Sequence, residues 1–121
     1  HTDDAGHANG DSERFYSAVR EADSRVARIW EAVRRREQLG ERWMVVVTTD
    51  HGRDATTGRG HGGQSARERT TWIVTNLSRA RRGFERGVPG IVDIAPSVLE
   101  HLGTVAPAEV GREMVGRSFL R

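Results

Sequence analysis

Three histidines that lie close to glycines could bind metal ions: His7, His51 and His61. Asp3 lies four residues before His7, and Asp50 directly precedes His51. Imidazole nitrogens and carboxylate oxygens form a common ligand set for zinc, manganese or iron. The protein has no cysteine, so a thiolate zinc site is excluded and His and Asp must supply the ligands. These residues indicate an open site of the catalytic kind.

Asp50 and His51 follow a short apolar run that is rich in β-branched residues, which predicts a strand over residues 43–48. Adjacent residues of an extended strand point to opposite sides. The turn at Gly52 can bring both side chains to one metal ion, or each side chain can face a different ion. Thr48 and Thr49, which precede this pair, are interpreted as strand residues with local hydrogen bonds.

Apolar residues recur at three- and four-residue spacing from Phe15 to Val33. This periodicity predicts an amphipathic helix over residues 12–38, with its apolar side packed in a core. Asp11 and Ser12 offer the N-cap of this helix. Residues 1–10 are expected to form a polar loop.

The rest of the chain alternates expected strands, loops and a helix, which indicates an α/β fold with strands buried on both faces, as in a parallel sheet. The expected elements are a long loop over residues 50–66, a strand over 71–75, an exposed connection over 77–90, a helix over 94–102 and a short strand or turn over 117–120. Asp93 is expected to cap the helix over 94–102, and Ile94, Val98 and Leu102 are expected to form its buried stripe.

The composition limits the possible functions. All nineteen basic residues are arginine, so the isoelectric point of about 10.3 overstates the positive charge at pH 7, where the net charge is +2. The basic clusters at residues 34–36 and 79–82 are expected to be solvated, and no nucleic-acid-binding motif accompanies them. No apolar run reaches the roughly 20 residues of a membrane helix. The 121 residues suffice for one small domain.

The order of the motifs resembles the C-terminal half of the alkaline phosphatase superfamily. The motifs are Asp3-x-x-Gly6-His7, a long helix, a strand that ends in Thr49-Asp50-His51-Gly52, and Gly60-His61-Gly62-Gly63. Segments 91–103 and 111–120 resemble the family's final helix and terminal turn. Within the superfamily, the chain most resembles the type I phosphodiesterase/nucleotide pyrophosphatase branch, with kinship to sulfatases and cofactor-independent phosphoglycerate mutases.

The resemblance implies a layered sheet with helices on both faces, of which residues 1–121 form the C-terminal metal-binding portion. It also implies two divalent metal ions, zinc in the first place with manganese as the alternative. Asp3, His7 and His61 match the ligands of one ion, and Asp50 and His51 match ligands of the second. Arg53 and Arg59 flank these loops and are candidates for contact with a substrate phosphate, because an arginine fork suits phosphate geometry.

The resemblance further implies hydrolysis of a small phosphate ester by a Thr or Ser nucleophile that opens a helix, through a covalent phosphoenzyme. No segment of the 121 residues matches that nucleophile motif, so the chain is interpreted as a fragment that is inactive or nearly inactive alone. The alternatives are a sulfatase-like or phosphoglycerate mutase-like reaction, or a non-catalytic metal- or partner-binding module. Bacterial members of such families often act outside the cytoplasm, but the sequence leaves the compartment and the oligomeric state open.

Overall fold

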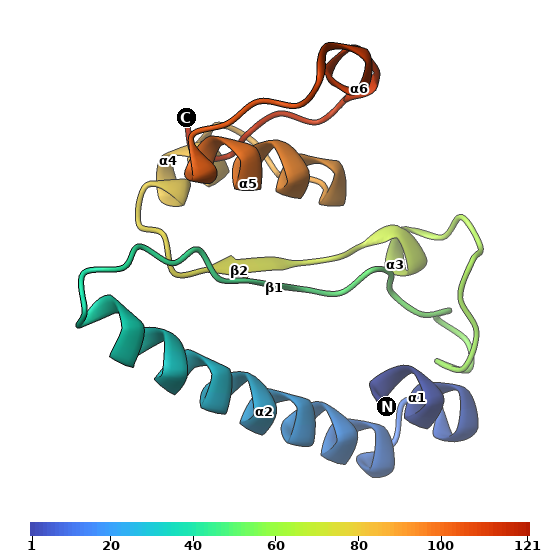
Figure 1. Ribbon diagram of the computed structural model, residues 1–121. Coiled ribbons are helices and arrows are strands. Elements are labelled where there is room, and N and C mark those ends of the chain that lie inside the picture. Colours follow the sequence, from blue (N-terminus) through green and yellow to red (C-terminus); the bar gives the residue numbers. More distant parts are fainter. The chain divides into compact units, whose positions relative to one another are not determined.

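The computed structural model describes residues 1–121, which divide into two compact units. The first unit comprises His1–Trp43 and His51–Thr70, and the second comprises Met44–Asp50 and Thr71–Arg121. The chain contains six α-helices, one short 3-10 helix and two strands (Figure 1). This mixed content is compatible with the expected α/β class, whereas the layered sheet with helices on both faces stays a prediction.

The first unit is built on the long helix α2, Glu13–Glu37, which confirms the helix predicted over residues 12–38 (Figure 1). Ser12 caps it, and its hydroxyl accepts a hydrogen bond from the backbone N–H of Phe15. The predicted apolar stripe is only partly covered, since Val33 is buried while Val19 and Ile29 are exposed.

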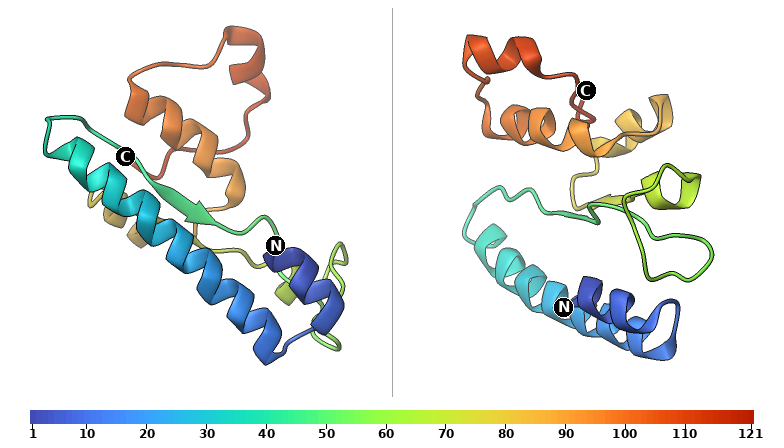
Figure 2. Two further views of the ribbon diagram at one scale, coloured as in Figure 1. Left: turned by 60° about the horizontal axis from the view of Figure 1, so that its bottom comes forward. Right: turned by 90° about the vertical axis from the view of Figure 1, so that its right-hand side faces the viewer.

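The prediction of a loop over residues 1–10 is wrong, because this segment forms helix α1, Thr2–Asn9. Asp3 and Asp4 lie in its first turn, where negative charge interacts favourably with the helix dipole. Gly6 is the residue that argues against a helix from sequence. In the structure it is buried, and α1 packs beside α2 (Figure 2).

Residues 50–65 contain no regular element, as the loop prediction required, and the short helix α3 follows at Ala66–Arg69. Ser65 and Glu68 form a capping box, in which the Ser65 hydroxyl accepts from the Glu68 N–H and the Glu68 carboxylate accepts from the Ser65 N–H. This box fixes the end of the loop.

The second unit contains strands β1, Val46–Thr48, and β2, Ile73–Thr75, at the two predicted places. Their pairing is antiparallel, with Val47 opposite Val74, so the expectation of parallel strands buried on both faces is wrong for this pair. Both strands are only half-buried, and the Val74 side chain is 59% exposed. A continuous apolar run does not distinguish a buried parallel strand from a half-covered antiparallel one.

The connection expected to be exposed contains helix α4, Ala80–Arg86, and a further unpredicted helix, α6, covers Ala108–Glu113. Ala80 is 1% exposed and forms the core of the second unit with Phe119 and Leu120. The turn predicted near the end of the chain is present at residues 119–120.

Helix α5, Ile94–Leu102, has the predicted bounds and ends at Gly103, whose φ is +68°. The short helix η1, Ile91–Asp93, precedes it. The buried stripe predicted for α5 holds in part for Ile94, which is half-buried against the core. It is wrong for Val98 and Leu102, which are exposed, and the fully buried residue of α5 is Ser97.

The Ser97 hydroxyl explains this burial, since it donates to the Asp93 carbonyl and accepts from the Phe119 N–H. Asp93 occupies the predicted N-cap position, but its carboxylate accepts from the backbone N–H groups of Gly90 and Arg117 instead of capping the helix.

No helix in the protein is both long enough and apolar enough to cross a membrane.

Candidate metal centre

Asp3, His7 and His61 converge in the first unit. Asp3 and His7 lie four residues apart on α1 and therefore on one face of that helix, and His61 comes from the glycine-rich loop. The Nε2 atom of His7 is 3.3 Å from Asp3 Oδ2 and 3.1 Å from His61 Nε2. His61 Nε2 is 3.8 Å from Asp3 Oδ1. Two sequence segments that are 54 residues apart thus present three ligand atoms to one point.

These separations fit a divalent transition metal. With metal–ligand distances of about 2.0–2.2 Å, the ligand atoms of a tetrahedral site lie about 3.3–3.6 Å apart. The separations of His7 Nε2 from His61 Nε2, 3.1 Å, and from Asp3 Oδ2, 3.3 Å, lie close to that range, and His61 Nε2 is 3.8 Å from the other Asp3 oxygen, Oδ1. Two imidazole nitrogens and one carboxylate leave a fourth position open, as in catalytic sites.

His51 lies against this group but through its ring face. Its ring stacks on the ring of His61, with centroids 3.7 Å apart and an interplanar angle of 20°. Its Nδ1 is 2.8 Å from the carbonyl oxygen of Gly52. An Nδ1–H that donates to this carbonyl places the ring's lone pair on Nε2, the arrangement that metal-binding histidines commonly adopt.

Asp50 is exposed and belongs to the second unit. The group of three ligand atoms includes neither Asp50 nor His51. The assignment of these two residues to a second metal ion therefore stays a prediction.

Arg53 is the only buried charged residue and contacts both segments of the group. Its Nη2 donates to the carbonyl oxygen of Asp3 at 2.8 Å and to Asp3 Oδ1 at 2.5 Å, while its Nη1 donates to the carbonyl oxygen of Arg59 at 3.1 Å. The prediction that Arg53 contacts a substrate phosphate is untested, but its side chain is only 9% exposed and its donors already have protein acceptors. Arg59 remains exposed.

Asp54 organises the loop that carries His61. Its carboxylate accepts hydrogen bonds from the backbone N–H groups of Thr56, Thr57 and Gly60 and from the Thr57 hydroxyl. These donors stabilise the ionised form and hold the pKa of Asp54 far below its ordinary range, the Thr57 N–H contributing most. The carboxylate thus fixes the backbone directly before His61.

Gly52 and Glu68 connect the same loop to α3. The Gly52 N–H donates to the carbonyl oxygen of Glu68 at 2.7 Å, and the Glu68 carboxylate accepts from the Gly63 N–H at 2.8 Å. Hydrogen bonds from the Ser65 hydroxyl and the Gly63 N–H lower the pKa of Glu68. Arg67 adds an ion pair with Asp11, so the loop is held at both ends.

The sequence did not identify Asp54 or Glu68 as structural residues of this centre, although both carried a recognisable signal. Ser65-x-x-Glu68 is a capping-box pattern, and Asp54-Ala-Thr-Thr-Gly58 is typical of a turn closed by an aspartate side chain.

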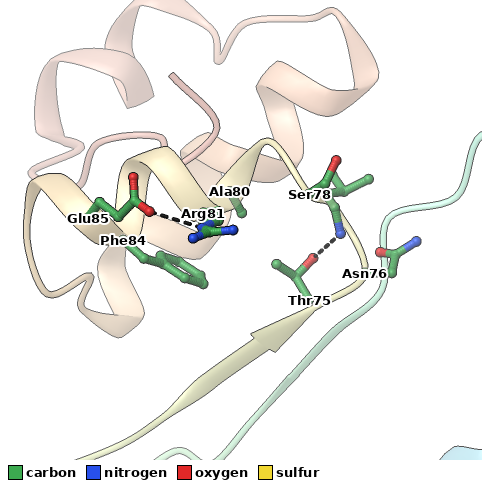
Figure 3. A pocket seen from close by; sticks show the side chains of 8 residues that line it. Thr75, Asn76, Ser78, Ala80, Arg81, Phe84 and Glu85 are labelled. Carbon is green, nitrogen blue, oxygen red and sulfur yellow. Dashed lines mark hydrogen bonds and ion pairs between the residues drawn. The ribbon is translucent and has the colours of Figure 1, made fainter.

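The second unit contains a hollow of about 520 Å³ between the end of β2 and α4 (Figure 3). Its lining pairs polar groups with one another, since the Thr75 hydroxyl accepts from the Leu77 N–H and Arg81 pairs with Glu85. The group of potential metal ligands does not line it. Thr48, in β1 of the same unit, donates its hydroxyl to the Trp72 carbonyl at 2.7 Å, as expected for a strand residue.

Comparison with known proteins identifies one family. Residues 1–114 match the family of type I phosphodiesterases/nucleotide pyrophosphatases, whose members hydrolyse small phosphoesters. No curated protein and no solved structure matches the sequence. The match includes both the segment that carries Asp3 and His7 and the segment that carries His61, and the chain belongs to the type I phosphodiesterase/nucleotide pyrophosphatase family.

Proposed function

We propose that this chain forms the metal-binding part of a metal-dependent phosphoester hydrolase that acts on phosphodiesters or nucleotides. The observation that carries the proposal is the convergence of Asp3, His7 and His61, whose ligand atoms all lie within 4.8 Å of one another. Membership of a hydrolytic family supports the reaction class. The metal, its ligands and the substrate are parts of the proposal.

In this proposal, Asp3, His7 and His61 hold one divalent ion, with zinc preferred and manganese as the alternative. Asp50 and His51 contribute to a second. Bound divalent ions would supply positive charge to the phosphoryl oxygens. The exposed Arg59 is the remaining candidate for orienting a substrate phosphate, because its side chain is not buried as that of Arg53 is.

The nucleophile is a separate part of the proposal. The family resemblance implies a Thr or Ser at the start of a helix, and neither Thr48 nor Thr49 matches that position. We therefore expect metal binding from these 121 residues, and little or no hydrolysis by them alone.

Two measurements test the proposal. Zinc and manganese binding is measured by calorimetry for the wild-type chain, for His61→Ala and for His101→Ala, a control histidine on α5. We expect His61→Ala to lose binding of the ion that Asp3, His7 and His61 hold in this proposal, and we expect His101→Ala to keep it. Equal metal content in all three proteins would contradict the ligand assignment.

Hydrolysis of a nitrophenyl phosphodiester and a nitrophenyl monoester is then measured with either metal added. Turnover well above buffer that disappears in Asp50→Ala would show that the chain is active alone and would overturn the expectation of a missing nucleophile. Preferential hydrolysis of a nitrophenyl sulfate by a longer form of the protein would favour the sulfatase-like alternative. Metal binding with no esterase activity in any form would favour a non-catalytic module.

A further inference from the structure

We propose that Arg53 is the positioning residue that assembles the metal centre: it favours binding of the ion by one carboxylate oxygen of Asp3 and joins α1 to the loop that carries His61. This inference rests on the proposed metal site and adds to it a residue that binds neither metal nor substrate.

The two carboxylate oxygens of Asp3 have different neighbours. Arg53 Nη2 donates to Oδ1 at 2.5 Å, whereas Oδ2 is the oxygen that faces His7 Nε2 at 3.3 Å. A charge-assisted hydrogen bond to one oxygen fixes the rotation of the carboxylate. Oδ1 also lies 3.8 Å from His61 Nε2, so Arg53 competes with a metal ion for this oxygen and favours binding of the ion by Oδ2 alone.

Arg53 also connects the two segments that carry the potential ligands. The same guanidinium donates to the carbonyl oxygen of Asp3 on α1 and to the carbonyl oxygen of Arg59, two residues before His61. The planar, rigid fork of an arginine can serve such separate acceptors at once, which a lysine ammonium cannot do in the same way. Arg53 thereby ties both sources of ligands to one group.

The neighbours of Arg53 leave a space that its side chain fills. Arg53 is 8% exposed, and its Cζ lies 5.6 Å from the centre of the Phe15 ring. A Cβ atom at Gly6 would lie 2.2 Å from Arg53 Cζ, so only glycine at this position of α1 leaves room for the guanidinium. A buried charge with a dedicated space and several acceptors is typical of a group that determines local structure.

Charge and positioning make opposite predictions for metal affinity. The positive charge of Arg53 repels a divalent ion, whereas its contacts preorganise the ligands. Replacement by lysine keeps the charge and removes the fork, so it isolates the positioning effect. Partners that orient metal ligands typically contribute about 10–100-fold to metal affinity. We expect Arg53→Lys to raise the zinc dissociation constant by about that factor.

The experiment compares zinc affinity of the wild-type chain, Arg53→Lys and the matched control Arg28→Lys, an exposed arginine of α2. Circular dichroism and urea unfolding of the metal-free proteins establish that each is folded, so that a loss of stability is separated from a loss of affinity. A second pair, Asp3→Asn and Asp3→Asn with Arg53→Lys, completes a double-mutant cycle. If Arg53 acts through Asp3, the lysine substitution has much less effect in the Asp3→Asn protein.

Each outcome decides a different question. Absence of zinc binding by the wild-type chain would refute the proposed metal site itself. Zinc binding by a folded Arg53→Lys protein that is as tight as in Arg28→Lys would overturn the positioning role. An equal effect of the lysine substitution in the wild-type and Asp3→Asn backgrounds would overturn the part of that role that acts through the Asp3 carboxylate. If Arg53→Lys does not fold, Gly6→Ala decides instead, because it displaces the guanidinium while Arg53 is retained. Unchanged zinc affinity in Gly6→Ala would then overturn the inference.

Discussion

Asp54 illustrates, at the scale of a single residue, how a carboxylate outside the group of three potential ligands can shape a candidate metal centre. Its carboxylate accepts hydrogen bonds from three backbone N–H groups of its own loop, including that of Gly60 next to His61. The backbone N–H groups of an irregular segment lack the partners that a helix or sheet would supply, and a carboxylate can accept their hydrogen bonds instead. The position of His61 therefore depends on a residue seven positions earlier in the chain.

The first prediction concerns the pH dependence of this stabilisation. Because folding lowers the pKa of Asp54 below its ordinary value of 3.8, its contribution is fully present above pH 3.8 and is lost as the pH falls below it. We expect Asp54→Asn to have a lower free energy of unfolding than the wild type at pH 7, and the difference to shrink below pH 3.8. Urea unfolding at pH 7, 5 and 3 measures it, with Asp23→Asn on the exposed side of α2 as control. A difference that is constant with pH would contradict the ionised hydrogen-bonded state.

At the scale of elements, the long loop is held by contacts between its backbone and α3. The Gly52 N–H bonds to the Glu68 carbonyl, and the Gly52 Cα lies so close to Arg67 that a Cβ would be 1.9 Å from the Arg67 carbonyl oxygen. The glycine after His51 is thus required by packing against a short helix. Its φ is not in the left-handed region, so the requirement is one of space.

The second prediction follows from this close approach. Gly52→Ala should lower the free energy of unfolding by about 1–3 kcal/mol, since the atom that blocks the new methyl group is backbone and cannot rotate away. Gly87→Ala is the matched control, because its surroundings are open and its φ is extended at 173°. It should be neutral or slightly stabilising. Equal stability of the two variants in urea would contradict the packing argument.

At the scale of the whole molecule, the two units carry different kinds of structure. All three ligands of the proposed tight site lie in the unit of α1, α2 and the glycine-rich loop. The other unit has the apolar core of Ala80, Phe119 and Leu120 and the two-stranded sheet. Burial of large apolar side chains is limited in both, so bound metal is expected to contribute substantially to folding stability.

The third prediction is that metal stabilises the first unit. A ligand that binds only the folded state stabilises it by about 2.7 kcal/mol at a concentration 100 times its dissociation constant. One equivalent of zinc should raise the midpoint of thermal unfolding, and hydrogen exchange should slow mainly in α1 and the loop over residues 51–65. His7→Ala should abolish both effects. Slower exchange confined to α4 and α5 would place the ion elsewhere.

The sequence by itself determined the types and order of the candidate ligands, the family, the helix over residues 13–37, the helix over 94–102 and the places of both strands. Each of these depends on near neighbours: apolar spacing of three and four residues, an N-cap, β-branched runs and short motifs.

The tertiary structure decided how the three candidates that the resemblance groups come together. Asp3 and His7 lie on one helix, which the glycine at position 6 argues against in the sequence. His61, which is 54 residues after His7, lies beside them because Asp54 holds its loop. Arg53, a candidate for substrate contact in sequence, is buried and donates to Asp3. The physical reason is that helix formation around Gly6 and burial of the guanidinium are stabilised by the same long-range contact, which local propensity does not encode.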